Sequence, residues 1–250
     1  MSLLNLSNVS FSYTAGKPVL HDINLTLEAG SNLGIVGESG SGKTTMLKLL
    51  LGLQRASAGQ VFFRGEALDI KNSGFMRGFR RSVQAVFKDP YSSLDPRQRV
   101  FDIIAEPLRS LKIETNILQA VSQALAAVDL SADALKRYPH EFSGGQRQRI
   151  AIARAIVSNP DLIIADEVVS ALDLSTRARI IELLRDLSKR MTFVVVSHDI
   201  ALVCMLCDRL IVLEKGKIVE QGATRDILAN PSHLYTQKLL ASTPRMPRAG

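Results

Sequence analysis

Cysteines, aromatic residues and long apolar runs are all scarce in this sequence. Of its 250 residues, 2 are cysteine and 5% are aromatic. The most apolar stretches, residues 46–53 and 162–169, contain charged residues and fall short of the roughly 18 residues that a transmembrane helix needs. We therefore expect a chain that does not itself span a membrane.

The first residues carry no recognisable targeting signal. Residues 1–5 read Met-Ser-Leu-Leu-Asn, with no basic stretch ahead of an apolar block and no small-residue cleavage site. A secretory signal peptide has these features. We expect a cytosolic protein on this ground.

The two cysteines, Cys204 and Cys207, form a C-x-x-C pair within the apolar stretch 200–207. The sequence has no second cysteine pair and no histidine at zinc-finger spacing downstream. We interpret both cysteines as small core residues of a helix, rather than as half of a metal site or as a redox pair.

The net charge is positive. Lysine and arginine number 31 against 24 acidic residues, which gives +7, while 46% of the residues are apolar and 22% are charged. This composition argues against a disordered chain and favours one large domain, or a core with subdomains. The positive charge suits nucleic acid, anionic lipid or a polyanionic ligand, but the arginine clusters lack the interleaved aromatic residues of a base-stacking platform.

The apolar pattern predicts an α/β protein. Alternating apolar residues predict strands within residues 4–11 and 23–27, joined by a turn at 16–18. Continuous apolar runs, typical of a parallel sheet buried on both faces, occupy residues 33–36, 162–165 and 193–196. Helical patterns occupy residues 45–53, 101–130 and 176–190, and a hairpin at 209–219 and a loose tail at 243–250 follow.

The segment Gly37–Thr44 matches the phosphate-loop pattern G-x-x-x-x-G-K-[ST] between a predicted strand and a predicted helix. In such a loop the backbone N–H groups face phosphate oxygens, the lysine neutralises the β- and γ-phosphates, and the hydroxyl of Thr44 reaches Mg²⁺. The residues expected to bind nucleotide here are Gly37, Ser39, Gly40, Ser41, Gly42, Lys43, Thr44 and Thr45, with Lys43 also expected to act in catalysis.

Two carboxylates follow the apolar run 162–165. Asp166 and Glu167 stand at the carboxyl end of a predicted buried strand, where open α/β sheets bind ligands. We expect Asp166 to hold Mg²⁺ and Glu167 to polarise the water that attacks the γ-phosphate.

A second anion-binding element lies between these two motifs. Ser143 is a predicted helix N-cap, and Gly144 and Gly145 come next, ahead of Gln146. A helix N-terminus with exposed backbone N–H groups favours an anion.

In this order, the motifs make the chain similar to the nucleotide-binding subunit of ATP-binding cassette (ABC) transporters. The signature Leu-Ser-Gly-Gly-Gln of that family stands here as Phe-Ser-Gly-Gly-Gln at residues 142–146. The resemblance covers nearly the whole chain and implies a P-loop NTPase core with a mainly parallel sheet, an antiparallel β subdomain and a helical, signature-bearing subdomain inserted at about 90–157. The ABC ATPase domain is expected over 1–229 and a short C-terminal extension over 230–250.

The resemblance also implies roles for single residues. Tyr13 would stack on adenine, His198 would touch the γ-phosphate as the switch histidine, and Asp173, in the loop after the catalytic glutamate, would contact the nucleotide. Two such subunits would sandwich two ATP molecules, each held between one phosphate loop and the signature segment of the other subunit. A monomer would then have half of each site.

Two segments are similar to the branch of this family that imports oligopeptides, dipeptides and nickel. They are residues 89–97, Asp-Pro-Tyr-Ser-Ser-Leu-Asp-Pro-Arg, and residues 230–240, which begin Asn-Pro-Ser-His-Leu-Tyr-Thr. The resemblance implies an ATPase that powers import of a peptide, nickel or a metal chelate, bound peripherally at the cytoplasmic face of the cell membrane. Its expected partners are two transmembrane permease subunits, a second identical or paralogous cassette and, indirectly, an extracytoplasmic solute-binding protein, with no nucleic acid.

Two positions depart from the family pattern. Lys88 replaces a glutamine that touches the metal and lines the groove for the membrane subunit, and Val168 and Val169 replace a proline and a small residue. An amine donates no oxygen to Mg²⁺ and repels the ion, so we expect hydrolysis at a site containing Lys88 to be slowed or altered, unless the lysine turns to solvent. The missing proline is expected to loosen the placement of Glu167, as a milder change.

Two alternatives stay open beside a transport ATPase. Lys88 favours a regulatory cassette that hydrolyses ATP poorly and is paired with a different, active ATPase subunit. The charge of +7 is the one feature that favours a nucleic-acid-linked or translation-linked cassette protein. Such relatives usually carry two cassettes or zinc-binding inserts, and neither is present in these residues.

Overall fold

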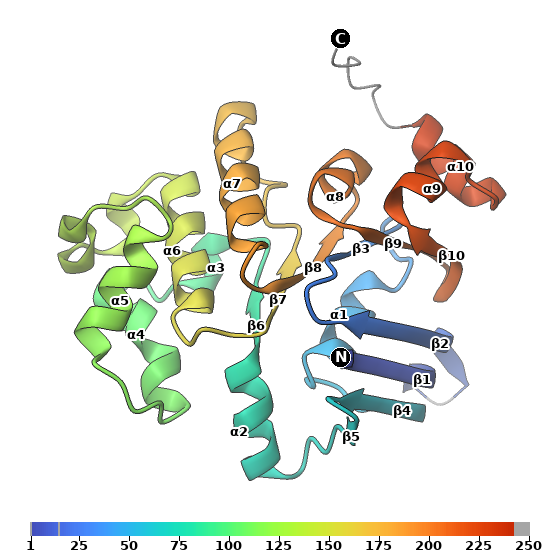
Figure 1. Cartoon of the computed structure of the whole chain (residues 1–250), viewed down its shortest axis with the longest axis horizontal. Coiled ribbons are helices and arrows are strands. Elements are labelled where there is room, and N and C mark those ends of the chain that lie inside the picture. The colour runs from blue at the N-terminus through green and yellow to red at the C-terminus, as the bar shows by residue number, and fades with distance from the viewer. Residues whose placement is uncertain (1, 15, 243–250) are drawn as a thin grey trace. The chain divides into compact units, whose positions relative to one another are not determined.

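The computed structural model describes residues 2–14 and 16–242, which divide into two compact units. The first unit contains the chain up to Lys71 and the chain from Thr192 onwards, drawn in blue to teal and in orange to red in Figure 1. The second unit is the intervening Asn72–Met191.

An antiparallel sheet in the first unit has the strand order β2-β1-β4-β5. Strand β1 (Ser2–Thr14) pairs with β2 (Lys17–Glu28) and with β4 (Ala58–Phe63), and β4 pairs with the short β5 (Glu66–Ala67). Leu4 and Leu6, and then Val9 and Phe11, are buried against the core, and the register of the strand shifts between Leu6 and Val9. The alternation that predicted the first two strands is therefore the alternation of buried and exposed faces.

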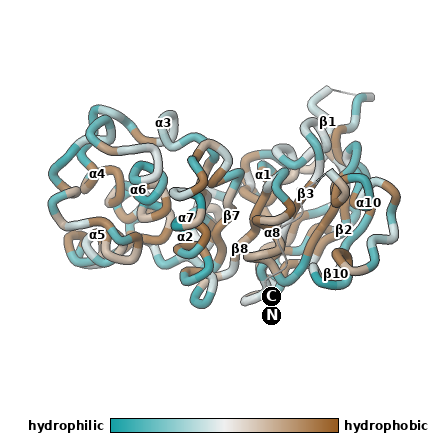
Figure 2. The backbone as a smooth tube through the Cα atoms, turned by 90° about the horizontal axis from the view of Figure 1, so that it is seen from above, coloured by the Kyte–Doolittle hydropathy of each residue, from teal (hydrophilic) through white to brown (hydrophobic). Residues whose placement is uncertain are grey.

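A second sheet of the first unit is built around β3 (Leu33–Val36). This strand runs parallel to β8 (Thr192–Ser197) and to β9 (Arg209–Glu214), and β10 (Lys217–Ala223) is antiparallel to β9. Every residue of β3 and β8 is buried, and hydrophobic residues follow one another along both strands (Figure 2). The continuous apolar runs and the closing hairpin are thus confirmed.

The helices of the first unit are α1 (Lys43–Leu50), α8 (Ile200–Leu206), α9 (Thr224–Ala229) and α10 (Leu234–Ala241). Cys204 lies in helix α8 and Cys207 directly follows its last residue, and both are free thiols. Cys207 is buried, Cys204 is half-buried, and burial raises the pKa of the Cys207 thiol. Within residues 2–14 and 16–242 no group of three or more His, Cys, Asp or Glu side chains could hold a metal ion.

The second unit has two parallel strands, β6 (Val83–Val86) and β7 (Leu162–Asp166), in register from Val83 opposite Leu162 to Val86 opposite Ala165. Its α-helices are α2 (Ser73–Ser82), α3 (Pro90–Ser93), α4 (Val100–Ser110), α5 (Ile117–Ala126), α6 (Gly144–Ile156) and α7 (Leu174–Leu187). Two 3₁₀ helices, η1 (Ala132–Lys136) and η2 (Pro139–Glu141), connect α5 to α6. The predicted helix at 176–190 is α7, and the predicted tail at 243–250 lies outside the described residues.

The helical pattern predicted over 101–130 is two helices, α4 and α5, with a turn between them. Lys112 adopts a left-handed φ of 53°, which ends α4, and the side chain of Asn116 accepts the N–H of Gln119 to begin α5. Apolar periodicity continues across such a turn because both helices pack on α6, so the break has to be read from its capping residues.

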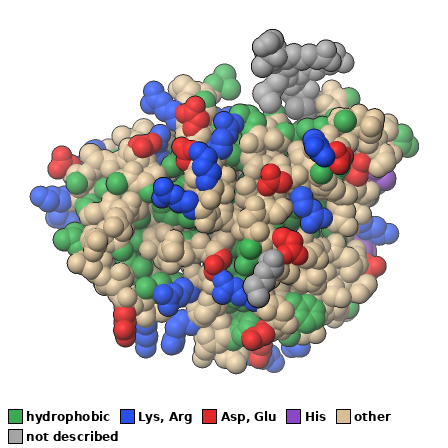
Figure 3. Space-filling model, in the orientation of Figure 1, with side chains coloured by type: hydrophobic (Ala, Val, Ile, Leu, Met, Phe, Trp, Pro, Cys, Tyr) green, Lys and Arg blue, Asp and Glu red, His purple; other side chains and the backbone are tan. Residues whose placement is uncertain are grey.

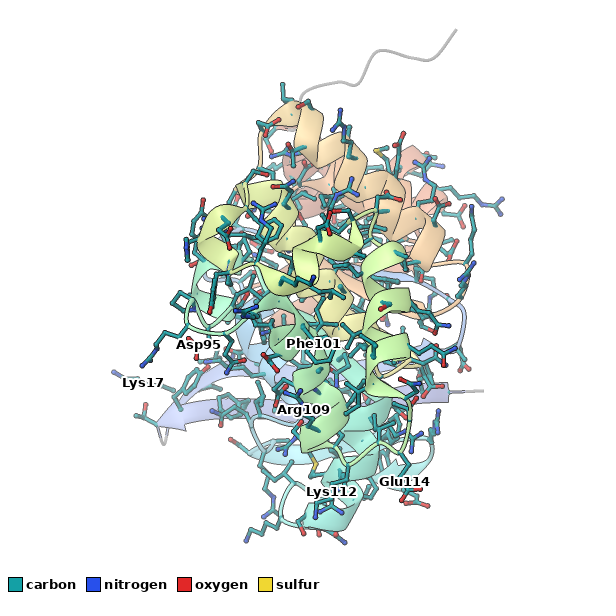
Figure 4. The ribbon with its side chains drawn as sticks, turned by 90° about the vertical axis from the view of Figure 1, so that its left-hand side faces the viewer. Lys17, Asp95, Phe101, Arg109, Lys112 and Glu114 are labelled. Carbon is teal, nitrogen blue, oxygen red and sulfur yellow. The ribbon has the colours of Figure 1, made fainter. Side chains whose placement is uncertain are left out.

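Charged side chains line an open cleft along α4. Arg109 points across Phe101 of the same helix, with its guanidinium 5.8 Å from the ring centre, and donates to Asp102 at 3.0 Å (Figure 4). The cleft has a volume of ≈ 740 Å³, and Arg97 and Arg99 also line it. On the face drawn in Figure 3, lysine and arginine side chains are interspersed with aspartate and glutamate.

Candidate functional site

The predicted phosphate loop joins β3 to α1, and glycines are required in it. Gly42 caps α1 with a left-handed φ of 108°, and a Cβ there would lie 2.8 Å from Cδ2 of Leu20. A Cβ on Gly37 would lie 2.2 Å from the carbonyl oxygen of Leu213. The backbone can therefore wrap closely only because both side chains are absent.

The interior of the loop offers hydrogen-bond donors. Lys43 is 9% exposed, and its ammonium donates to the carbonyl oxygens of Gly37 at 2.6 Å and Glu38 at 2.7 Å. The hydroxyl of Ser41 is buried and has no hydrogen-bond partner. A buried hydroxyl without a partner is costly unless a ligand supplies one. These residues therefore fit a phosphate group.

Tyr13, the predicted adenine contact, lies beside the start of α1. Its ring is 54% exposed and packs edge-on against Phe11 at 4.8 Å between centres. Its hydroxyl lies 3.3 Å from that of Thr45, the predicted loop residue, and this hydrogen bond lowers the pKa of Tyr13. The exposed ring is thus held next to the phosphate loop. Thr44, the predicted Mg²⁺ ligand, is exposed.

His198, the predicted γ-phosphate contact, lies at the same edge of the sheet as the start of the phosphate loop. Strands β3 and β8 are parallel, with Val36 opposite Ser197, so Gly37 and His198 are the next residues of neighbouring strands. His198 is exposed. The carboxyl ends of parallel strands are where such sheets bind ligands.

Two predicted site residues of the second unit are joined by an ion pair. The ammonium of Lys88 lies 2.5 Å from Oε2 of Glu167. Val86 is opposite Ala165, and each charged residue lies two positions beyond its member of this pair. The side chain of Lys88 is 56% exposed and that of Glu167 is 16% exposed, and the hydrogen bond and charge of Glu167 raise the pKa of Lys88. Lys88 therefore contacts the predicted base, a partner that the sequence did not predict.

The turn after Asp166 is strained and closed by a serine. Glu167 has a left-handed φ of 46°, which is unfavourable for a residue with a side chain. The backbone N–H and the hydroxyl of Ser170 donate to the carbonyl oxygen of Glu167 at 3.0 and 2.9 Å. Val168 and Val169, which replace the proline pattern, are both buried. Two hydrogen bonds and burial hold this turn where a proline would stiffen it.

Asp173 caps helix α7 in the structure. Its carboxylate accepts the N–H of Thr176 at 3.0 Å and the hydroxyl of Ser175 at 2.7 Å, and these hydrogen bonds lower its pKa. This cap fixes the start of α7. Its predicted nucleotide contact stays a prediction.

The signature segment begins α6 with a reciprocal cap. Gln146 donates its N–H to the hydroxyl of Ser143 at 3.4 Å and accepts the N–H of Ser143 at 3.0 Å on its side chain. A Cβ on Gly145 would lie 2.2 Å from Cγ2 of Thr176 in α7, whereas one on Gly144 would meet nothing closer than 3.9 Å. The second signature glycine is thus required for helix packing, and Ser143 is exposed at the helix start.

The predicted residues form two groups, one in each unit. The first unit holds the phosphate loop with Tyr13 and His198, and the second holds Lys88, Asp166, Glu167, Asp173 and the signature segment. The predicted Mg²⁺ ligands are a hydroxyl oxygen, from Thr44, and a carboxylate oxygen, from Asp166. Oxygen donors of this kind fit magnesium.

One contact of the phosphate loop was not predicted from the sequence. The hydroxyl of Tyr235 in α10 accepts the N–H of Glu38 at 2.8 Å. The two residues are 197 positions apart. No local pattern indicates such a pair, although the segment 230–240 was singled out for its similarity to one family branch.

Comparisons with protein families give two matches. The family described as ABC transporter matches residues 20–170. The family described as oligopeptide/dipeptide transporter, C-terminal region, matches residues 219–250.

Individual relatives and solved structures also come from ABC transporters or ATP-binding cassettes. The oligopeptide transport ATP-binding protein OppF of Lactococcus lactis subsp. lactis is 42% identical over 226 residues, which cover 89% of this chain and 71% of OppF. The solved structure of cbiO1 from Clostridium perfringens, part of the ABC transporter complex cbiONQ, superposes with a TM-score of 0.82 at 26% identity, over 92% of this chain and 91% of cbiO1. The dimeric structure of the ATP-binding cassette MJ0796 in a post-hydrolysis state with ADP and Pi gives a TM-score of 0.78 at 30% identity, over 89% and 99% of the two chains.

Proposed function

The chain belongs to the ABC transporter family, and we propose that it binds and hydrolyses ATP to power import of a peptide or a related small solute through a membrane permease. The family match confirms the resemblance inferred from the motifs, and the match to solved cassette structures confirms the α/β P-loop fold. The observation that carries the proposal is the phosphate loop, in which buried Lys43 and the unpartnered hydroxyl of Ser41 supply donors for phosphate oxygens.

Each group of residues has a role toward ATP in this proposal. Tyr13 stacks on adenine, the phosphate loop binds the β- and γ-phosphates, and His198 contacts the γ-phosphate. Mg²⁺, which neutralises phosphate charge, would be held by Thr44 and Asp166. Glu167 accepts a proton from the attacking water as general base.

Two cassettes complete the sites. Ser143 stands exposed at the N-terminus of α6, where backbone N–H groups favour an anion. We assign this segment, with Gly144 to Gln146 and with Asp173 nearby in the same unit, to an ATP molecule bound at the phosphate loop of a second cassette. The dimeric form of MJ0796 supports this arrangement.

The chain is proposed to act at the cytoplasmic face of the cell membrane as a peripheral subunit. None of the helices among the described residues has the length and apolarity to cross a bilayer. We assign membrane attachment to two permease subunits, and an extracytoplasmic solute-binding protein would deliver the solute to them. The name of OppF and the match over 219–250 favour peptides over nickel or a metal chelate.

Reconstitution tests this function. The chain, purified with its permease subunits and placed in vesicles, is expected to drive ATP-dependent uptake of peptide. Vesicles that contain the Lys43→Ala variant instead should show no ATP-dependent uptake. ATP binding without permease association would contradict the proposed transport role.

A second candidate function is favoured by the ion pair between Lys88 and Glu167. A base held by an ammonium is less available to accept a proton, because the positive charge stabilises the carboxylate. In this alternative the chain binds ATP and closes on a partner, while a different ATPase subunit performs most of the hydrolysis. Turnover of the isolated chain, compared with that of the mixed pair, distinguishes the two functions.

A further inference from the structure

Tyr235 connects the C-terminal segment of the chain to the phosphate loop. Its side chain is 8% exposed, and its hydroxyl accepts the N–H of Glu38 at 2.8 Å. The carbonyl oxygen of the same Glu38 accepts the ammonium of Lys43 at 2.7 Å. Glu38 is therefore fixed on both sides of its backbone, by the C-terminal helix and by the loop lysine.

The segment that carries Tyr235 is itself attached to β10. Oε1 of Glu220 accepts the N–H and the hydroxyl of Ser232, both at 2.8 Å, and Oε2 accepts the N–H of His233 at 3.1 Å. The ring of His233 then accepts the N–H of Tyr235 at 3.2 Å and caps α10. Burial alone would raise the pKa of Glu220, but the hydrogen bonds from residues 232–236 outweigh it and lower the pKa to about 2.

The turn that precedes β10 also contacts the phosphate loop. Gly216, in the turn between β9 and β10, donates its N–H to the carbonyl oxygen of Ser41 at 2.8 Å. Position 216 requires glycine, because its φ of 77° is left-handed and a Cβ there would lie 2.1 Å from the carbonyl oxygen of Val19. The loop is thus held by the β9–β10 turn at Ser41 and by Tyr235 at Glu38.

We propose that Tyr235 is a positioning residue for nucleotide binding, through which the C-terminal segment sets the ATP affinity of the phosphate loop. This inference rests on the proposed ATP-binding function. Tyr235 acts through the Gly37–Glu38 peptide group, to whose N–H it is bonded, and touches no reacting atom. The carbonyl oxygen of that same peptide group, from Gly37, accepts the ammonium of Lys43 at 2.6 Å, so releasing Tyr235 loosens a carbonyl that orients the lysine. A displacement of α10 by a partner would then be transmitted to the nucleotide through a single hydrogen bond.

The test is a Tyr235→Phe variant of the full chain, which keeps the buried ring and removes the hydroxyl. Loss of one hydrogen bond predicts a Kd for ATP and ADP that rises by about 2- to 10-fold. KM should rise with it, while kcat at saturating ATP stays unchanged, a split that general loss of stability would not produce. Glu220→Gln should raise the Kd in the same direction, and Tyr138→Phe, in the second unit, should not.

The outcomes separate this inference from the function on which it rests. An unmodified chain that binds ATP together with a Tyr235→Phe variant of equal Kd would overturn the role of Tyr235 alone. An unmodified chain that fails to bind ATP would overturn both.

Discussion

Nζ of Lys88 lies 2.5 Å from Oε2 of Glu167, just beyond the carboxyl ends of the neighbouring parallel strands β6 and β7. The resemblance to ABC cassettes leads us to expect a glutamine at position 88, and Glu167 is the proposed base. The uncharged amide of a glutamine could contact the same carboxylate without stabilising its negative charge. The pair therefore gives a physical reason to expect slow hydrolysis.

Replacement of Lys88 by glutamine is predicted to raise ATP turnover. The lysine is 56% exposed, so solvent screens the pair and the gain should be modest, about 2- to 5-fold. Lys189→Gln is the matched control, because Lys189 pairs with Asp186 at 2.6 Å on the surface of the same unit. Steady-state phosphate release measures both variants. Equal or lower turnover in Lys88→Gln would show that the ion pair does not restrain the base.

Ser170→Ala is predicted to lower kcat by about 2- to 10-fold and leave the Kd for ATP unchanged, because its hydroxyl helps to hold the strained backbone of Glu167. Ser188→Ala removes a similar hydroxyl, which donates to the carbonyl of Arg185 at 2.8 Å, and should leave kcat unaltered. Single-turnover kinetics with bound ATP separate the two quantities. A change in Kd without a change in kcat would place Ser170 outside catalysis.

Gly42→Ala is predicted to weaken ATP binding by more than about 10-fold, since a left-handed φ costs a side chain roughly 1–2 kcal/mol and the new Cβ also meets Leu20. Gly65→Ala is the control, because Gly65 has a φ of 83° in the β4–β5 turn and open space around it. Calorimetric titration with ATP compares the two. If Gly42→Ala and Gly65→Ala lost ATP affinity to the same extent, backbone strain in general, rather than the geometry of the phosphate loop, would explain the loss.

Glu220 predicts a defined pH dependence of stability. Its pKa is lowered to about 2, so the stability that it contributes is complete above its ordinary pKa and is lost as the pH falls toward 2. Glu220→Gln should therefore lower Tm by a few degrees at pH 7, and the difference should shrink below about pH 4.5. Glu114→Gln, at an exposed position, should leave Tm unchanged at both pH values. A difference that is constant from pH 7 to pH 3 would contradict this assignment.

Local patterns predicted much of the fold. Continuous apolar runs indicated β3, β7 and β8 because these strands are buried on both faces, and the alternation of β1 reflected one buried face. The break between α4 and α5 was missed because apolar spacing continues across it. Short strands such as β6, with two of four residues half-buried, have a weaker pattern.

The candidate site was predictable where its chemistry is local. The phosphate loop needs glycines at fixed spacing, so Gly37 and Gly42 identify it in the sequence alone. Contacts between distant residues were not predictable in the same way. Lys88 and Glu167 are 79 positions apart, and strand register brings them together. The contact of Tyr235 with the loop likewise depends on how β10 and α10 fold back.

The most direct test is Mg-ATP turnover of the purified chain over a range of protein concentrations, with Glu167→Gln beside it. Turnover should rise faster than linearly with concentration, because two cassettes form each site, and the variant should fall by at least about 100-fold while still binding ATP. Turnover that survives in Glu167→Gln would contradict the assignment of Glu167 as the base. Failure of the unmodified chain to bind ATP would contradict the proposed function as a whole.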